Sequence, residues 1–331
     1  MLKAAITDYS YPDVDIESRV LCPPEVHLDH RQCKTAEALI DLVKDADVVI
    51  TQFAPITKEV IESMSKARAI IRYGIGVDNV HLETAASMGI PVCNVPDYCI
   101  DEVADHALSF ILASARSIVP NCLHVRAGKW GLAGSLSEMR CMRDQTVGIV
   151  GFGRIGREVA LRLAGFKCRR LVFDPMVASS VVSELGCESV SLDELFQQSD
   201  IVTLHCPSIA STRRVVNEQS LSKMKHGSIV VNVSRGDLVD TKALEAALQS
   251  GQLGAAAIDV CDPEPIPPDS PLRSLPNVVS ASHLAWASVP AMSRLRETAA
   301  KLALEALRGS SPRNVVNGVL KLRMGYQNEN A

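Results

Sequence analysis

A glycine-rich turn within residues 146–157, which read TVGIVGFGRIGR, limits most strongly what this chain can fold into. A short apolar run ends at Gly151, and Gly153 and Gly156 complete the pattern G-x-G-x-x-G. The residues before the turn have the composition of a buried strand, and residues 154–165 carry apolar side chains at helical spacing. A strand, this turn and a helix in succession predict a dinucleotide-binding unit of a parallel α/β sheet.

Each glycine of the pattern has its own physical task. Gly151 permits the tight turn, Gly153 lets a pyrophosphate approach the backbone, and Gly156 lets the helix pack closely against the strand. The first turn of the helix adds free N–H groups and the positive end of the helix dipole, which favour phosphate. The alternative is a tight strand-to-helix turn that binds no ligand.

Asp174 ends the next expected strand, residues 169–174, and predicts which dinucleotide binds. A carboxylate at this place accepts hydrogen bonds from the ribose hydroxyls of NAD and repels the 2′-phosphate of NADP. No Arg or Lys follows it until Arg213. We therefore predict NAD as the cofactor; the alternative for Asp174 is a solvated aspartate in a turn.

Apolar strands alternate with helices along most of the chain, which predicts an α/β protein with parallel sheets. The first half contains expected strands at residues 3–8, 46–52, 69–74 and 91–95. The second half contains six, at residues 147–151, 169–174, 200–206, 227–234, 254–260 and 277–282. We predict two doubly wound parallel-sheet domains, a Rossmann cofactor domain and a flavodoxin-like substrate domain.

Two long helices are expected to connect these domains. Residues 101–117 form an apolar helical run that could cross between domains or subunits, and a last helix covers residues 289–307. We expect the last helix to return to the first domain and make it discontinuous. The predicted division is a substrate domain of residues 1–100 plus 290–331 and an NAD-binding domain of residues 101–289.

Composition narrows the partners of the chain. It has 331 residues, a net charge of −4 and no basic tract, which argues against nucleic-acid binding. No apolar run approaches the length of a membrane span or of a signal peptide core, so we expect no membrane partner. The ten cysteines include no C-x-x-C pair, which predicts reduced thiols in the cytoplasm. We find no clustered ligands and predict no metal site.

Polar side chains follow three consecutive strands of the predicted cofactor sheet. Arg235 follows residues 227–234, Asp259 and Glu264 lie at and beyond the end of the next strand, and His283 follows the last one. The carboxyl ends of parallel strands meet at the edge where ligands bind, so we expect these side chains near a bound nicotinamide. Each alone suits a structural role, such as a turn arginine or a solvated glutamate, but the four together favour a catalytic site.

Their chemistry fits reduction of a 2-oxo acid. A protonated His283 can deliver a proton to the carbonyl oxygen, and Glu264 beside it can stabilise the protonated ring and fix its orientation. The Arg235 guanidinium can bind the substrate carboxylate bidentately. Asp259 can accept a hydrogen bond from the nicotinamide carboxamide. The cofactor carries the hydride, and the protein supplies geometry and protons.

Six stretches of the chain together resemble the D-isomer-specific 2-hydroxyacid dehydrogenases. They read RYGIGVDNV, VGIVGFGRIGREVA, LHCP, NVSRGDLVD, AAAIDVCDPEP and HLAWAS. The resemblance implies an NAD-dependent oxidoreductase that acts on CH–OH groups, with Arg235, Glu264 and His283 as catalytic residues. It also implies a homodimer, formed through helices that flank the cofactor domain, such as residues 101–117.

The resemblance extends to individual binding residues. Besides the three glycines, it implies cofactor contacts by Arg154, Ile155, Asp174, His205, Cys206, Pro207, Thr212, Val233, Ser234, Arg235, Asp259 and His283. The expected substrate contacts are Arg72, Tyr73, Ile75, Gly76, Arg235, His283 and Trp286, with the backbone N–H groups of Ile75 and Gly76 on the substrate carboxylate. For Arg72 an ion pair with Asp78 or Asp97 is the alternative.

Two branches of the family share further features with this chain. Arg72 together with Trp286 resembles the C-terminal-binding-protein branch, whose members bind NAD and also act as corepressors. Arg72 before the glycines likewise resembles phosphoglycerate dehydrogenases. The expected function is reduction of a small 2-oxo acid or oxidation of the 2-hydroxy acid. The alternatives are a phosphoglycerate dehydrogenase of serine synthesis and an NAD(H)-sensing binding protein.

Overall fold

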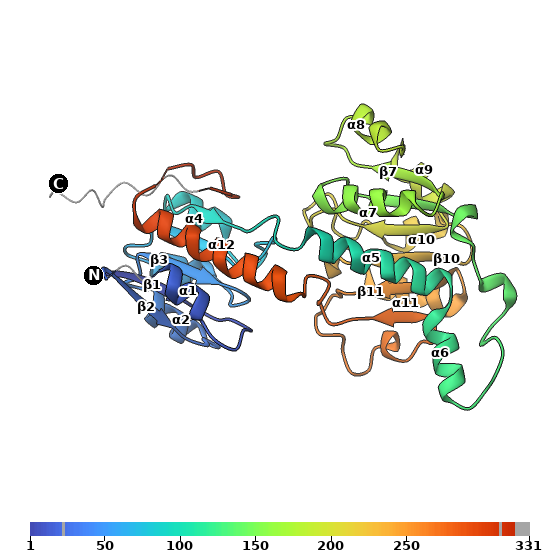
Figure 1. Ribbon diagram of the computed structural model, residues 1–331, viewed down its shortest axis with the longest axis horizontal. Helices are drawn as coiled ribbons and strands as arrows, with labels where there is room; N and C mark the ends of the chain where they lie inside the picture. Colours follow the sequence, from blue (N-terminus) through green and yellow to red (C-terminus); the bar gives the residue numbers. More distant parts are fainter. Residues whose placement is uncertain (22–23, 311–312, 322–331) are drawn as a thin grey trace. The chain divides into compact units, whose positions relative to one another are not determined.

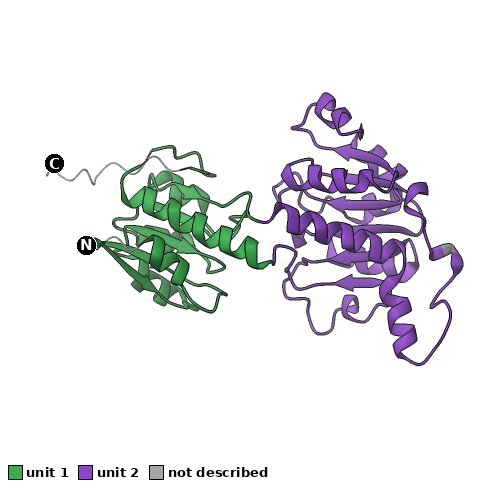
Figure 2. Cartoon of the chain, viewed as in Figure 1, with its two compact units in different colours: residues 1–98, 288–331 green, residues 99–287 purple. Residues whose placement is uncertain are grey.

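The computed structural model describes residues 1–21, 24–310 and 313–321. The chain divides into two compact units, each treated separately below (Figure 2). Unit 1 contains residues 1–98 and 288–331, and unit 2 contains residues 99–287. The last stretch of the predicted substrate domain, beyond residue 321, lies outside the described residues.

Unit 1 is built on a five-stranded parallel sheet with the order β2-β1-β3-β4-β5, which is the flavodoxin-like order. Its strands are β1 (Leu2–Ile6), β2 (Val26–His30), β3 (Val48–Thr51), β4 (Ala69–Arg72) and β5 (Val92–Cys93). All four residues of β3 are buried, as expected for a central strand covered on both faces. β2 was not predicted, because this edge strand alternates polar and apolar residues and is only partly buried.

Helices cover both faces of this sheet (Figure 1). They are α1 (Asp15–Val20), α2 (Ala36–Val43), α3 (Lys58–Glu62), α4 (Leu82–Ser87) and α12 (Val289–Leu307). The helices α2, α3 and α4 share one hydrophobic cluster with the sheet. The last helix packs against α1, β3 and β4, so the end of the chain completes the first unit. Ser288 caps α12 by accepting a hydrogen bond from the N–H of Ala291, which sets its start as predicted.

A buried ion pair joins α1 to α12. The Arg296 guanidinium lies 2.7 Å from a carboxylate oxygen of Glu17, and both side chains are almost fully buried. Arg296 also reaches Asp13, and the Tyr73 hydroxyl donates to Glu17. Removing one partner of such a pair leaves an unpaired buried charge, so this cluster ties the two helices together.

Unit 2 is built on a seven-stranded parallel sheet with the order β12-β11-β10-β9-β6-β7-β8. Its strands are β6 (Thr146–Val150), β7 (Arg169–Phe173), β8 (Glu188–Ser189), β9 (Ile201–Leu204), β10 (Ser228–Asn232), β11 (Leu253–Ile258) and β12 (Val278–Ser280). This is the Rossmann order with one added edge strand, and the strand order reverses at β6 and β9. The sequence predicted six strands and missed β8, a two-residue edge strand that is exposed.

The helices of unit 2 form two layers (Figure 1). They are α5 (Ile100–Ala115), α6 (Ile118–Arg126), α7 (Arg154–Ala164), α8 (Ser179–Glu184), α9 (Leu192–Gln198), α10 (Glu218–Lys223) and α11 (Thr241–Ser250). One face of the sheet shares a hydrophobic cluster with α9, α10 and α11. The helices α5 and α7 pack against each other, and α5 also contacts β10 and β11. The fold-class prediction is confirmed in both units.

The predicted helix over residues 101–117 is wrong at its end. α5 stops at Ala115, and Ser117 has a left-handed backbone, after which α6 starts in a new direction. The two helices are bent by 63° from each other. Within the described residues, no single helix is long and apolar enough to cross a membrane. Only α5 and α6 taken together pass that test, by length and composition.

Candidate active site

The glycine turn of unit 2 joins β6 to α7 and has the geometry that its sequence requires. Gly151 has φ +94°, and a Cβ placed there would overlap the backbone of Cys206. A Cβ on Gly156 would overlap the carbonyl oxygen of Gly151. At Gly153, by contrast, no other atom of the described chain lies within 4 Å of a built Cβ. The turn therefore keeps open space over Gly153, at the N-terminus of α7, which fits a phosphate.

Asp174 follows β7 and lies beside the glycine turn. One carboxylate oxygen accepts from the N–H of Phe152 at 2.7 Å, and the other accepts from the N–H of Met176 at 2.9 Å. Each carboxylate oxygen can accept more than one hydrogen bond, so both can also bind hydroxyl groups. Asp174 thus positions the turn in addition to offering a negative charge to a ligand.

The residues after β9 form a second loop along the same edge. His205 bonds to Thr203 through its ring Nε2 at 2.8 Å, and burial lowers the pKa of His205 to about 3, so its ring is neutral. Burial raises the pKa of the Cys206 thiol to about 11, so this thiol stays protonated. Thr212 closes the loop by donating to the carbonyl of Pro207 at 2.6 Å. The bonds of His205 to Thr203 and of Thr212 to the Pro207 carbonyl hold the loop in shape with neutral groups.

The loop after β10 carries Val233, Ser234 and Arg235. Val233 is buried, and the Ser234 hydroxyl donates to the carbonyl of Cys206, which joins this loop to the preceding one. The half-buried Arg235 donates through one guanidinium nitrogen to the carbonyl of Ser234. A Cβ on the next residue, Gly236, would overlap the backbone of Cys261. Only glycine fits at position 236, where the loop passes close to the Cys261 backbone. This close packing holds the neighbouring Arg235 at the edge of the sheet.

His283 and Glu264, two of the predicted catalytic residues, lie in direct contact. The ring Nδ1 of His283 lies 2.8 Å from a carboxylate oxygen of Glu264. His283 has φ +55°, and its N–H donates to the carbonyl of Asp259. The side chains of His283 and Glu264 are both partly exposed. The Nδ1 contact leaves Nε2 as the ring nitrogen that can exchange a proton with a ligand.

Asp259 positions the loop that carries His283. Its buried carboxylate accepts from the N–H groups of Leu284 and Ala285, both at 2.9 Å. Trp286 adds a further support, because its indole N–H donates to the carbonyl of His283 at 2.9 Å. The sequence predicted a contact with nicotinamide for Asp259, but it did not predict this structural role.

The sequence analysis did not consider His106, which lies close to Asp259. It lies in α5, and its Nε2 is 3.8 Å from a carboxylate oxygen of Asp259. The only signal in the sequence was a polar ring in the apolar stretch VADHALSF. A histidine in such a helix suits a structural role as well as a functional one.

The predicted substrate loop of unit 1 follows β4. The Arg72 guanidinium fills the space where a Cβ of Gly74 would lie, and it is 5.9 Å from the centre of the Phe53 ring. The carbonyl of Ile75 accepts from the Asn94 side chain at 2.6 Å. Within the described residues, the backbone N–H groups of Ile75 and Gly76 donate to no acceptor of the chain. They are therefore available to bind an anion.

The structure corrects the expectation for Tyr73. Its side chain is 2% exposed, and its hydroxyl donates to Glu17 inside unit 1. Burial and the Glu17 carboxylate raise its pKa well above the usual value. Successive residues of an extended segment point to opposite sides, so the side chain of Tyr73 packs into the core while Arg72 does not.

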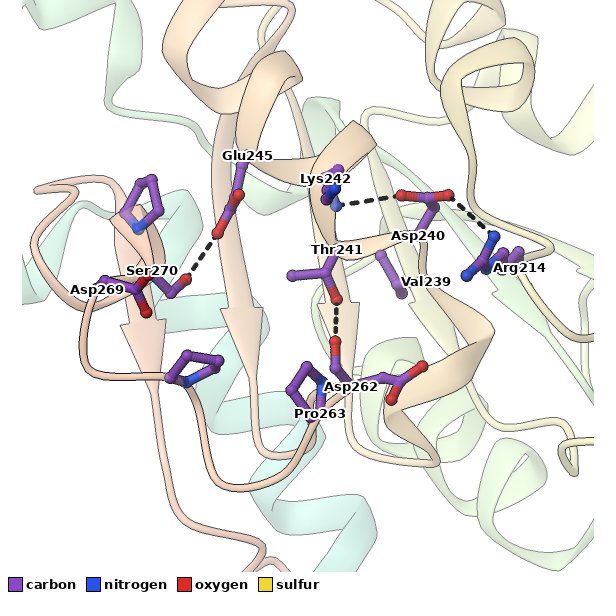
Figure 3. Close-up of a pocket in the computed structure, with 12 residues that line it drawn as sticks. Arg214, Val239, Asp240, Thr241, Lys242, Glu245, Asp262, Pro263, Asp269 and Ser270 are labelled. Atoms are coloured by element: carbon purple, nitrogen blue, oxygen red, sulfur yellow. Dashed lines mark hydrogen bonds and ion pairs between the residues drawn. The ribbon is translucent and has the colours of Figure 1, made fainter.

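A pocket of about 600 Å³ also lies in unit 2, between the start of α11 and the loop after β11 (Figure 3). No predicted site residue lines it, although Asp262 and Pro263 precede Glu264. Several of its polar groups bond to each other, such as Ser270 to Glu245 at 2.6 Å and Thr241 to the carbonyl of Asp262 at 2.6 Å. These bonds fasten the loop that carries Glu264.

No metal site accompanies these residues. Across residues 1–21, 24–310 and 313–321, no group of three or more His, Cys, Asp or Glu side chains is arranged to hold a metal ion. The nine cysteines in this part of the chain are free thiols.

Comparison with known proteins agrees with the resemblance. A family model described as "D-isomer specific 2-hydroxyacid dehydrogenase, NAD binding domain" matches residues 108–285. A glyoxylate reductase of Korarchaeum cryptofilum is 40% identical over 296 residues, which are 88% of this chain and 89% of that protein. A D-3-phosphoglycerate dehydrogenase of Methanocaldococcus jannaschii is 35% identical over 86% of this chain, but the match covers 54% of that protein.

A solved structure shows the same similarity in three dimensions. The D-lactate dehydrogenase of Aquifex aeolicus, solved as a complex with NAD and lactic acid, superposes with a TM-score of 0.84 at 26% identity. The match covers 95% of this chain and 99% of that one. The resemblance that the six sequence stretches predicted is confirmed, and so is NAD as the cofactor. The chain belongs to the family of D-isomer-specific 2-hydroxyacid dehydrogenases, which are NAD-dependent oxidoreductases.

Proposed function

We propose that this dehydrogenase reduces a small 2-oxo acid, with His283 as the proton donor. The observation that carries the proposal is the 2.8 Å contact between His283 Nδ1 and Glu264, at the end of the sheet that carries the glycine turn. Glu264 fixes the ring and stabilises its protonated form, and Nε2 delivers the proton to the carbonyl oxygen of the substrate. NADH supplies the hydride to the carbonyl carbon.

Other groups of the chain bind and orient the substrate in this proposal. In unit 2, Arg235 binds the substrate carboxylate through its guanidinium, which can form two parallel charge-assisted hydrogen bonds. In unit 1, the N–H groups of Ile75 and Gly76 offer donors to a carboxylate oxygen, and Arg72 offers a further positive charge. We assign unit 1 as the substrate domain and unit 2 as the NAD-binding domain.

The similarity to a glyoxylate reductase makes glyoxylate the first candidate substrate. The test is the rate of NADH oxidation with glyoxylate, pyruvate, hydroxypyruvate and 3-phosphohydroxypyruvate. We expect turnover with the small 2-oxo acids. A preference for the phosphorylated compound would favour the phosphoglycerate dehydrogenase alternative. Tight NADH binding with no turnover on any of them would favour the NAD(H)-sensing alternative and contradict the proposal.

Asp174 is proposed to select NADH over NADPH. Replacing it in Asp174→Asn keeps an acceptor oxygen for the N–H of Phe152 but removes the negative charge that repels a 2′-phosphate. The preference for NADH over NADPH, measured as the ratio of kcat/KM values, should fall roughly ten-fold or more, the scale of a charge-assisted hydrogen bond. Equal use of NADPH by the wild type would show that Asp174 does not set the preference.

We also propose a homodimer in the cytoplasm, formed through α5, α6 and the segment after α6. Large apolar side chains are exposed there, namely Ile118, Leu123, Val125, Trp130, Leu132 and Leu136. Trp130 is 92% exposed, which a second copy of the chain would cover. The free thiols suit a reducing compartment. The small-molecule chemistry of the site and the net charge of −4 call for neither nucleic acid nor a membrane.

Trp130→Asp should therefore weaken the dimer. A charge in an apolar interface must lose its water, so we expect the protein to sediment as a monomer at micromolar concentration. Met176→Asp, which alters an exposed apolar residue elsewhere in unit 2, is the control and should leave the mass unchanged. A wild-type monomer, or an unchanged mass for Trp130→Asp, would contradict this interface.

A further inference from the structure

The loop of unit 1 that carries the N–H groups of Ile75 and Gly76 has two bonded carbonyl groups. The carbonyl of Gly74 accepts from the backbone N–H of Val95 at 2.9 Å. The carbonyl of Ile75 accepts from the side-chain amide of Asn94 at 2.6 Å. Asn94 and Val95 are consecutive residues directly after β5, so both carbonyls point to the same side of the loop.

Peptide geometry converts these two bonds into a direction for the N–H groups. Each peptide unit is planar and trans, so its N–H points opposite to its C=O. The Gly74 carbonyl shares a peptide unit with the Ile75 N–H, and the Ile75 carbonyl shares one with the Gly76 N–H. Both N–H groups therefore point away from Asn94 and Val95. Successive N–H groups that point to one side form a backbone site for an anion.

The arrangement depends on a turn and on one buried side chain. Gly74 has φ +143°, which side chains rarely adopt, and its N–H donates to the Arg72 carbonyl at 2.9 Å. Beyond this turn, no backbone N–H of the described chain donates to the carbonyl of Ile75. The Asn94 amide takes that place, and Asn94 is 8% exposed, so its surroundings hold it there.

We propose that Asn94 is a positioning residue of the 2-oxo acid site: its amide holds the Ile75 carbonyl and thereby turns the Gly76 N–H toward the substrate carboxylate. This inference rests on the proposed function, which assigns that N–H to the carboxylate. The carboxylate keeps its charge throughout the reduction, so a lost bond to it weakens the bound substrate and the transition state alike. Loss of Asn94 should therefore raise KM while kcat changes little.

The test is steady-state kinetics of Asn94→Leu, which has a side chain of similar size without a donor. The Ile75 carbonyl is then unbonded, and its peptide unit can rotate. We expect KM for glyoxylate and for pyruvate to rise by the same factor, roughly ten-fold, the scale of a hydrogen bond to a charged group. The inhibition constant of oxamate, an unreactive 2-oxo acid analogue, should rise by that factor too. Kd for NADH, measured by fluorescence titration, should change little.

Asn317→Leu is the matched control. Its amide also donates to a backbone carbonyl of unit 1, that of Ile90 at 2.9 Å, before the start of β5. We expect this variant to lose thermal stability without a change in KM or in oxamate inhibition. If Asn94→Leu does not fold, Asn94→Ser replaces it, because the shorter side chain ends before the Ile75 carbonyl, and KM should again rise.

Unchanged KM and oxamate inhibition in a folded Asn94 variant would overturn this inference and leave the proposed function intact. A fall in kcat at unchanged KM would also overturn it. Equal rises in KM for the Asn94 and Asn317 variants would mean a general loosening of unit 1, which contradicts a specific role for Asn94. A wild type that binds NADH but turns over no 2-oxo acid would overturn the proposed function itself.

Discussion

His283→Asn should lower kcat for the best 2-oxo acid by about 10²–10⁴-fold, the contribution of general acid catalysis, with a much smaller change in KM. Asparagine suits the test because His283 has a left-handed backbone, which asparagine tolerates better than most residues. The variant keeps the loop while removing the proton donor. Steady-state kinetics with saturating NADH measure the effect, and near-normal kcat would remove His283 from the mechanism.

Glu264→Gln is the matched variant for the same pair. The amide keeps the size of the side chain and can still contact His283 Nδ1, but it no longer stabilises the protonated ring. We therefore expect a milder loss of kcat and a pH optimum for reduction that moves downward. An unchanged pH profile would show that the 2.8 Å contact has no catalytic role.

Arg235→Gln should have the second largest effect. A guanidinium that binds a carboxylate forms two charge-assisted hydrogen bonds, each worth about 1.5–3 kcal/mol, so kcat/KM should fall roughly 10²-fold or more. The loss should be similar for every 2-oxo acid, because all share the carboxylate. Arg235→Lys should recover only part of it, since an ammonium group cannot make the bidentate contact.

The dissociation constant for NADH is the control measurement for Arg235→Gln. Besides the contact of the guanidinium with the Ser234 carbonyl, the loop backbone is held by the Asn232 side chain and by the close packing of Gly236, and both remain in the variant. We therefore expect Kd for NADH to change little in Arg235→Gln. A large loss of NADH binding would mean that Arg235 mainly shapes the cofactor loop.

The sequence predicted the features that depend on local patterns. The geometry of the glycine turn agrees with the sequence pattern, because Gly151 needs a positive φ and Gly151 and Gly156 each lie too close to neighbouring backbone for a Cβ. Central strands such as β9 and β10 were found because burial on both faces makes them continuous apolar runs. The exposed edge strands β2 and β8 lack that pattern, and the sequence analysis missed both.

The site was less predictable where contacts join segments that are far apart in the chain. Nothing in the local sequence shows that Asp259 holds the N–H groups of Leu284 and Ala285, or that His106 on α5 lies beside it. A substrate contact was expected for Tyr73, yet its hydroxyl donates to the buried carboxylate of Glu17. These pairings depend on the tertiary fold, which residue spacing does not encode.

The most direct test of the central claim is the chirality of the product. Hydroxypyruvate, or another 2-oxo acid whose product is chiral, is reduced with NADH, and the 2-hydroxy acid is resolved by chiral chromatography. A D-2-hydroxyacid dehydrogenase gives the D enantiomer alone, with one NADH consumed for each molecule formed. Formation of the L enantiomer, or binding of NADH without turnover of any 2-oxo acid, would contradict this account.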